Sequence, residues 1–195
     1  MEQGLSTERR TVEFAEIFHC SQAQYMNYQG SDVGRRATGL KVGVCLIRYD
    51  LVRYLEEFDN EQLPQHARTR CAADLMKTML EGKTWFEKKA NQELRAICEE
   101  TDLGFDFHAE LSRKCKGVYK LTELEKYAEY RHNLSGHYDL EIASSIEKLS
   151  AVDAKSLIGD AKQFAKYLNQ WVLNLRDVFE APNKTIQRTS GTAGC

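Results

Sequence analysis

The chain has 195 residues, 42% of them hydrophobic and 29% charged, and its formal net charge at pH 7 is −2. This length suits one well-packed domain and is short for two. The balance of 27 basic and 29 acidic residues excludes a strongly basic domain that holds nucleic acid through its overall charge, although a local positive cleft stays compatible with an RNA partner.

The other bulk features indicate a cytoplasmic protein. No stretch approaches the roughly 18 apolar residues of a membrane-spanning helix, and the N-terminus has no apolar core of signal-peptide length. The six cysteines include no C-x-x-C pair, which predicts reduced thiols rather than a disulfide framework or a zinc site. They are Cys20, Cys45, Cys71, Cys98, Cys115 and Cys195.

Apolar residues recur at helical spacing through most of the chain, and the only two prolines, Pro64 and Pro182, are far apart. A first helix is expected over 12–28. Its buried side would carry Phe14, Ile17, Phe18 and Tyr25. A second helix is expected over 35–58; its β-branched patch alone is typical of a strand, but the length of the pattern favours a helix.

The middle of the chain predicts further helices separated by short breaks. Apolar spacing indicates one helix over 65–80 and another over 84–100. The following residues, 101–116, are expected to form a loop that runs into a short helix. The pattern resumes over 120–134, where leucines and a tyrosine make an apolar stripe.

The clearest amphipathic helix is expected over 154–179, and "SAVD" just before it supplies N-cap residues. The polar and small residues that follow cannot build a core, so we expect a disordered tail over 181–195, and a disordered N-terminus over 1–10. The predicted fold class is therefore all-α, a single helical bundle over 11–180. The tail resembles those encoded when bacterial integron-cassette genes read into their recombination site.

The stretch "EYRHNLSGHYD", residues 129–139, is the main candidate for a functional site. Each residue of an unbroken helix turns by about 100°, so Arg131 and His137 would differ by about 240° and face different sides. They converge only if the helix bends or ends at "NLSG", where Ser135 and Gly136 weaken it, or if two protomers each supply one motif. The spacing leaves both arrangements open.

Convergence of this arginine and histidine would suit metal-independent cleavage of RNA. A histidine can take a proton from an attacking hydroxyl and return one to a leaving oxygen. A guanidinium offers paired donors to phosphate oxygens and stabilises charge that develops on them. The ribose 2′-hydroxyl, which DNA lacks, would be the nucleophile. The structural alternative is a helix end, because basic residues favour the C-terminal dipole and Asn, Ser and Gly commonly stop helices.

The motif and its flanks resemble the HEPN superfamily, whose signature is R-x(4–6)-H. Within it, Tyr130, Arg131, His137 and Asp139 stand where the AbiU-like abortive-infection subgroup has a helix ending in tyrosine-arginine, followed by a histidine and an aspartate. The likeness covers about residues 120–175, including the long amphipathic helix, while the first hundred residues match only as helical.

The resemblance implies a dimeric bundle of HEPN type that acts as a bacterial ribonuclease effector or toxin, in phage defence or in a toxin–antitoxin pair. It assigns Arg131 and His137 as the catalytic pair, without metal or cofactor, and implies RNA, a second copy and an antitoxin protein as partners. Gly136 replaces the usual alanine and His132 the common asparagine. Many members are non-catalytic, so the alternative is a helical binding protein for RNA, a nucleotide or a protein, with a structural R-x5-H motif.

The remaining motif residues receive supporting roles. His132 and Asn133 would position the phosphate or hold the motif, and Tyr130 and Asp139 would orient the site by hydrogen bonding. A metal site at His132 and His137 is disfavoured because an i, i+5 spacing gives poor same-face geometry and no cysteine lies nearby.

A second candidate is "KTWFEKK", which combines Trp85 and Phe86 with lysines. Aromatic side chains beside cations can form a stacking platform for nucleic-acid bases. The alternative, which the helical spacing favours, is that these aromatic residues anchor the helix in the core.

Overall fold

The computed structural model describes most of the chain between the second predicted helix and the tail. The described residues are 19, 32–60, 62–101, 103–130, 147 and 151–190, with side chains of the last helix described as far as 176 and at 178. Every element in these ranges is helical and none is a strand, which confirms the all-α fold class. Of the described helices, none combines the length and the apolar character that a bilayer crossing requires.

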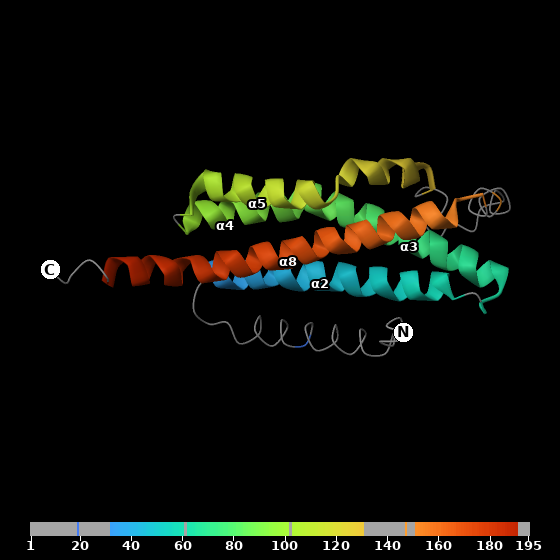
Figure 1. Cartoon of the computed structure of the whole chain (residues 1–195), viewed down its shortest axis with the longest axis horizontal. Coiled ribbons are helices and arrows are strands. Elements are labelled where there is room, and N and C mark those ends of the chain that lie inside the picture. Colours follow the sequence, from blue (N-terminus) through green and yellow to red (C-terminus); the bar gives the residue numbers. More distant parts are fainter. Residues whose placement is uncertain are drawn as a thin grey trace, which may run out of the picture.

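The helices form an elongated bundle (Figure 1). In chain order they are α2 (Asp32–Asp59), α3 (Gln65–Trp85), η1 (Phe86–Ala90), α4 (Asn91–Glu100), α5 (Gly104–Val118), η2 (Leu121–Tyr127) and α8 (Ala154–Ser190). The most extensive packing is that of α2 against α3 and against α8. Helix α5 packs against α4 and α8. The end of α2 and the starts of α3 and α8 therefore meet at one end of the bundle, where η2 also lies (Figure 1).

An aromatic cluster centred on Phe86 fills the middle of the core. The Phe86 ring lies 4.9 Å from the Trp171 ring and 5.2 Å from the Tyr167 ring, measured between centroids. Phe164 completes the cluster, edge-on to Phe86 at 6.4 Å. All four side chains are buried, so η1 is tied to α8 through large apolar contacts.

Two glycines allow the helices to approach closely. A Cβ on Gly82 of α3 would lie 2.9 Å from Cζ of Phe164, and one on Gly43 of α2 would lie 2.8 Å from Cζ2 of Trp85. Both distances are shorter than van der Waals contact. Glycine at these positions therefore lets the aromatic rings of neighbouring helices lie directly against a backbone.

The predicted break between 65–80 and 84–100 is wrong. The structure has one uninterrupted helical run from α3 through η1 to α4. The run contains a π-helical turn at Phe86–Ala90, and the Asn91 side chain donates to the Phe86 carbonyl oxygen at 3.0 Å. Gly82 weakens helix propensity locally, but its lack of a side chain leaves room for the Phe164 ring against the continuous helix.

Two other boundaries differ from the sequence prediction. The range 101–116, where a loop running into a short helix is expected, is mostly helix, because α5 spans Gly104–Val118 and buries Leu111 and Cys115. The stretch at Leu121–Tyr127 was expected to be α-helical and instead forms a 3₁₀ helix, with Leu124 and Tyr127 buried. In the second stretch apolar spacing locates the buried Leu124 and Tyr127 correctly but does not define the type of helix.

The N-cap predicted for the last helix is confirmed. Asp153 accepts hydrogen bonds from the backbone N–H groups of Lys155 at 3.1 Å and Ser156 at 3.2 Å. At its other end α8 continues to Ser190, so the disorder predicted over 181–195 is not confirmed for the part of that range that the structure describes. The prediction of a helix over 12–28 falls outside the described residues except at His19, which is helical and exposed.

The cysteines of the described ranges are free thiols. Cys45, Cys71, Cys98 and Cys115 are all buried and form no disulfide. This agrees with the prediction of reduced cysteines that fill the core as small apolar side chains.

Candidate functional site

Of the six residues predicted to form the site, Tyr130 alone lies within the described residues. The predictions for Arg131, His132, Asn133, His137 and Asp139 fall outside the described residues. The described chain resumes at residue 151, apart from residue 147. The residues on either side of the segment 131–150 are held by contacts with α8 and the core.

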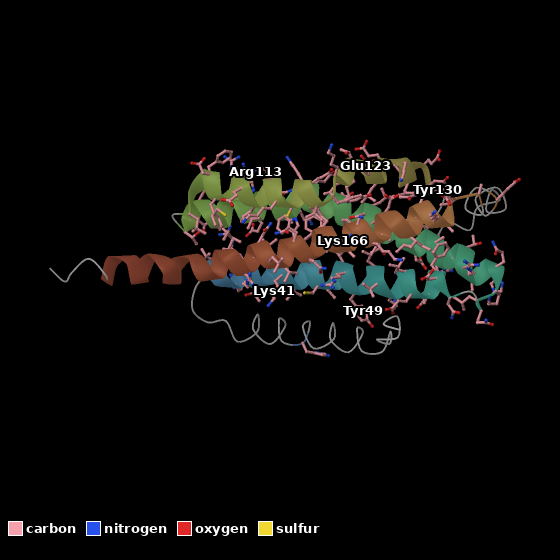
Figure 2. The ribbon with its side chains drawn as sticks, in the orientation of Figure 1. Lys41, Tyr49, Arg113, Glu123, Tyr130 and Lys166 are labelled. Atoms are coloured by element: carbon pink, nitrogen blue, oxygen red, sulfur yellow. The ribbon has the colours of Figure 1, made fainter. Side chains whose placement is uncertain are left out.

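Tyr130 anchors the start of the segment. It follows η2 at the end of the bundle where α8 begins (Figure 2). Its side chain is half-buried and packs against the core. Burial is the main cause that raises the pKa of its hydroxyl, and the charge of Glu129 adds to it. Tyr130, which is predicted to support the site, is therefore packed against the core of the bundle.

A carboxylate on α8 holds the helix that leads into the motif. Asp160 accepts a hydrogen bond from the Tyr127 hydroxyl at 2.7 Å and one from the Tyr119 hydroxyl at 3.2 Å. Lys126 forms an ion pair with the same carboxylate at 2.6 Å, and only 16% of the Asp160 side chain is exposed. These bonds fix η2 on the second turn of α8.

The end of the segment is fixed on the same helix. Asp153 caps α8, and Val152 and Ala154 pack against the core. The residues that precede and follow 131–150 are thus both attached to the first turns of α8. Whatever conformation the segment adopts, its two ends are held at this end of the bundle.

Alkaline pH should destabilise the protein through the tyrosines that Asp160 binds. Burial first, and Asp160 second, raise the pKa of Tyr119 and Tyr127 above the ordinary value of 10.0. Above about pH 10 the unfolded chain releases these protons while the folded chain retains them, so the free energy of unfolding falls as pH rises. Urea unfolding from about pH 8 to pH 11 measures this decline.

Tyr127→Phe provides the comparison for this prediction. The variant loses one of the ionising groups and one hydrogen bond to Asp160. Its urea midpoint should be lower at neutral pH but should fall less steeply between about pH 10 and pH 11. The same slope in the wild type and the variant would contradict the assignment.

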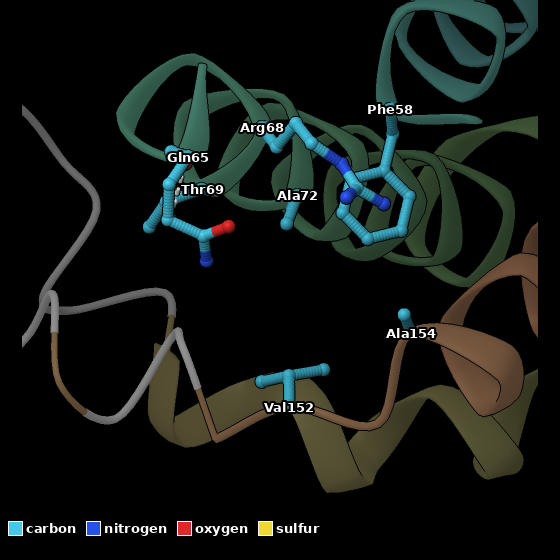
Figure 3. Close-up of a pocket in the computed structure, with 7 residues that line it drawn as sticks. All are labelled: Phe58, Gln65, Arg68, Thr69, Ala72, Val152 and Ala154. Carbon is cyan, nitrogen blue, oxygen red and sulfur yellow. Dashed lines mark hydrogen bonds between the residues drawn. The ribbon is translucent and has the colours of Figure 1, made fainter. Parts of the chain in front are cut away.

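A cavity of about 150 Å³ lies at this end of the bundle (Figure 3). Its walls come from the end of α2, the first turns of α3 and the start of α8. The lining residues are Phe58, Gln65, Arg68, Thr69, Ala72, Val152 and Ala154. Val152 and Ala154 lie two and four residues after the segment 131–150, so the cavity adjoins the place where the described chain resumes.

Arg68 is the charged group of this cavity. Its guanidinium carbon lies 5.7 Å from the centre of the Phe58 ring, which favours a cation–π contact. Its Nε atom is enclosed and has no hydrogen-bond partner among the described residues. A part-buried guanidinium with an N–H group that no described residue bonds is suited to donate to an anionic or carbonyl oxygen.

Sequence reasoning did not identify this cavity. The local sequence does not indicate that Phe58 and Arg68 line one cavity, because the connector that contains Pro64 separates them. The facing wall comes from Val152 and Ala154, far along the chain. No periodicity predicts that these elements meet, since the meeting depends on how α2, α3 and α8 pack.

The alternative reading of "KTWFEKK" is confirmed for Phe86, which is 0% exposed in the aromatic cluster. Trp85 is half-buried and lines a shallow groove between α2 and α3, beside Gly43 and Ile47. Phe86 therefore anchors the core and is not available to stack on a base.

Among the described side chains, no group of three His, Cys, Asp or Glu residues is arranged to hold a metal ion.

Comparison of the chain with known protein families, with curated proteins and with solved structures finds no match. The function is therefore argued from the residues of this chain and their surroundings.

Proposed function

We propose that this protein is a metal-independent endoribonuclease of HEPN type, an effector or toxin of bacterial phage defence or of a toxin–antitoxin system. The proposal comes from the Arg131 and His137 motif and its flanks. The structural observation that supports it is the attachment of both ends of 131–150 to the first turns of α8. A segment closed at its base in this way can bring residues from its two halves together.

In the proposed reaction His137 takes the proton of a ribose 2′-hydroxyl, whose oxygen attacks the adjacent phosphorus. The bond from phosphorus to the 5′-oxygen breaks, and that oxygen takes the proton that His137 removed from the 2′-hydroxyl. The products are a 2′,3′-cyclic phosphate and a 5′-hydroxyl. Arg131 donates to the non-bridging oxygens, where negative charge develops.

The other motif residues support this pair in the proposal. His132 and Asn133 position the phosphate, while Tyr130 and Asp139 orient the site. The partners proposed are RNA, a second copy of the chain and an antitoxin protein, in the cytoplasm. A second copy is proposed because two motifs can meet across an interface, which removes the need for one helix to bring both residues to the same face.

The second candidate function is non-catalytic binding of RNA, a nucleotide or a protein. The cavity at Arg68 favours it, because a cation beside an aromatic ring can bind a ligand without any contribution from Arg131 or His137. Cleavage separates the two candidates, since a binding protein leaves its RNA intact.

The test is incubation of the purified full-length chain with single-stranded RNA and with DNA of the same sequence, each with a metal chelator. We expect cleavage of the RNA only, with products that end in a 2′,3′-cyclic phosphate, because DNA has no 2′-hydroxyl. Cleavage of the DNA, or cleavage that stops when the chelator is added, would contradict the mechanism. Intact RNA together with measurable binding would favour the second candidate.

A further inference from the structure

The cavity at the end of the bundle has walls of two kinds. Figure 3 shows the Arg68 guanidinium against the Phe58 ring on one side, with the Gln65 amide directed into the space between the walls. The facing side consists of Val152 and Ala154. One side thus offers hydrogen-bond donors and an acceptor, and the other is purely aliphatic.

The polar groups of the cavity are available to a ligand to different degrees. The Thr69 hydroxyl already donates to the backbone oxygen of Gln65 at 3.0 Å. The Nε atom of Arg68 has no hydrogen-bond partner among the described residues. A primary amide has two N–H donors and one oxygen acceptor, so Gln65 can complement a ring that carries both kinds of group at its edge.

The size of the cavity limits what it can hold. Its volume is about 150 Å³, and an apolar cavity of about 150 Å³ engineered in another protein binds benzene. One six-membered ring therefore fits, whereas the fused second ring of a purine needs additional room. A lone phosphate would leave the apolar part of the lining, which comes from Phe58, Ala72, Val152 and Ala154, without a complementary surface.

We propose that this cavity binds one pyrimidine base of the RNA, with the ring between the aliphatic wall and Arg68, and with Gln65 bonded to its edge. The inference rests on the proposed function for its substrate class. Bases of single-stranded RNA are commonly stacked on aromatic or guanidinium planes and read at their edges. The cavity adjoins Val152, where the chain returns from the segment 131–150, so the bound nucleotide lies beside the end of the motif segment.

Binding of free nucleotides tests the cavity without any cleavage. The probes are uridine, cytidine and adenosine 5′-monophosphates and inorganic phosphate, titrated into the full-length chain by calorimetry. We expect the two pyrimidine nucleotides to bind more tightly than the other probes. Arg68→Ala should weaken their binding by roughly tenfold, as expected for loss of one good base contact, and Gln65→Ala should weaken it as well.

Arg70→Ala is the matched control. Arg70 lies on the same helix, its side chain is 79% exposed, and it pairs with Asp74 outside the cavity. This variant should bind the nucleotides like the wild type. Gln65 is exposed at the start of α3, so Gln65→Ala retains a folded protein to test if Arg68→Ala does not fold.

The outcomes separate this inference from the proposed function. If RNA stays intact but uridine monophosphate binds and the binding depends on Arg68 or Gln65, the ribonuclease proposal fails and the base site stands. If RNA is cleaved but neither pyrimidine nucleotide binds, the base site is wrong. Equal binding of adenosine monophosphate or of inorganic phosphate, or binding that ignores both substitutions, would also overturn it.

Discussion

Replacing His137 by alanine is expected to lower the rate of RNA cleavage by a factor of about 10² to 10⁴, the usual contribution of a positioned acid or base. Arg131→Ala should cost a comparable factor, about 10² to 10³, because donors directed at developing charge are stabilising mainly in the transition state. The measurement is the single-turnover rate of cleavage of an end-labelled single-stranded RNA. Toxicity on expression in bacteria should be lost in parallel.

The matched controls are exposed residues of the same types. His66 is exposed near the start of α3, and Arg113 is exposed on α5 (Figure 2). His66→Ala and Arg113→Ala should cleave RNA at the wild-type rate, since neither belongs to the proposed site. Circular dichroism and urea midpoints of the four variants establish that they are equally folded. Equal cleavage by the wild type, Arg131→Ala and His137→Ala would show that the proposed mechanism is wrong.

Much of the fold can be predicted from the sequence because the signals are local. The long amphipathic pattern gives α8, and the Asp153 cap needs only a carboxylate placed before the helix. The helix predicted over 35–58 corresponds to α2, Asp32–Asp59. In each case the information lies within a few turns of the chain, so no tertiary contact is needed to read it.

The errors arise where tertiary contacts decide the local structure. Gly82 is a reasonable place to predict a break, yet its lack of a side chain is what admits the Phe164 ring against α3. The same reason applies to η2, which is held by a hydrogen bond from Tyr127 to Asp160, on a helix far along the chain. Helix propensity depends on the local sequence and carries no information about such tertiary contacts.

The candidate site divides in the same way. The R-x5-H motif can be found in the sequence because it is contiguous. The cavity cannot, because Phe58, Arg68 and Val152 come from three parts of the chain that meet only in the folded bundle. In our proposal the motif supplies the chemistry and the cavity selects the base.

Replacing Phe86 by alanine is expected to lower the free energy of unfolding by about 3–5 kcal/mol, the usual cost of removing a buried phenyl ring. Phe86 is 0% exposed, and its ring contacts those of Tyr167 and Trp171 at 5.2 Å and 4.9 Å. Single domains are stable by only about 5–15 kcal/mol, so the change removes a large share of the total. Urea unfolding at neutral pH measures it.

Phe105→Ala is the matched control, because the Phe105 ring is 56% exposed and contacts Arg95 at the surface. The loss of unfolding free energy in Phe105→Ala should stay below about 1 kcal/mol, the range of a surface cation–π contact.

Under conditions where Phe86→Ala is folded, this variant should bind RNA as the wild type does, since the Phe86 ring faces the core of the bundle. Loss of RNA binding with an unchanged urea midpoint would instead assign Phe86 to a stacking surface, and the aromatic cluster would not be the anchor that joins η1 to α8.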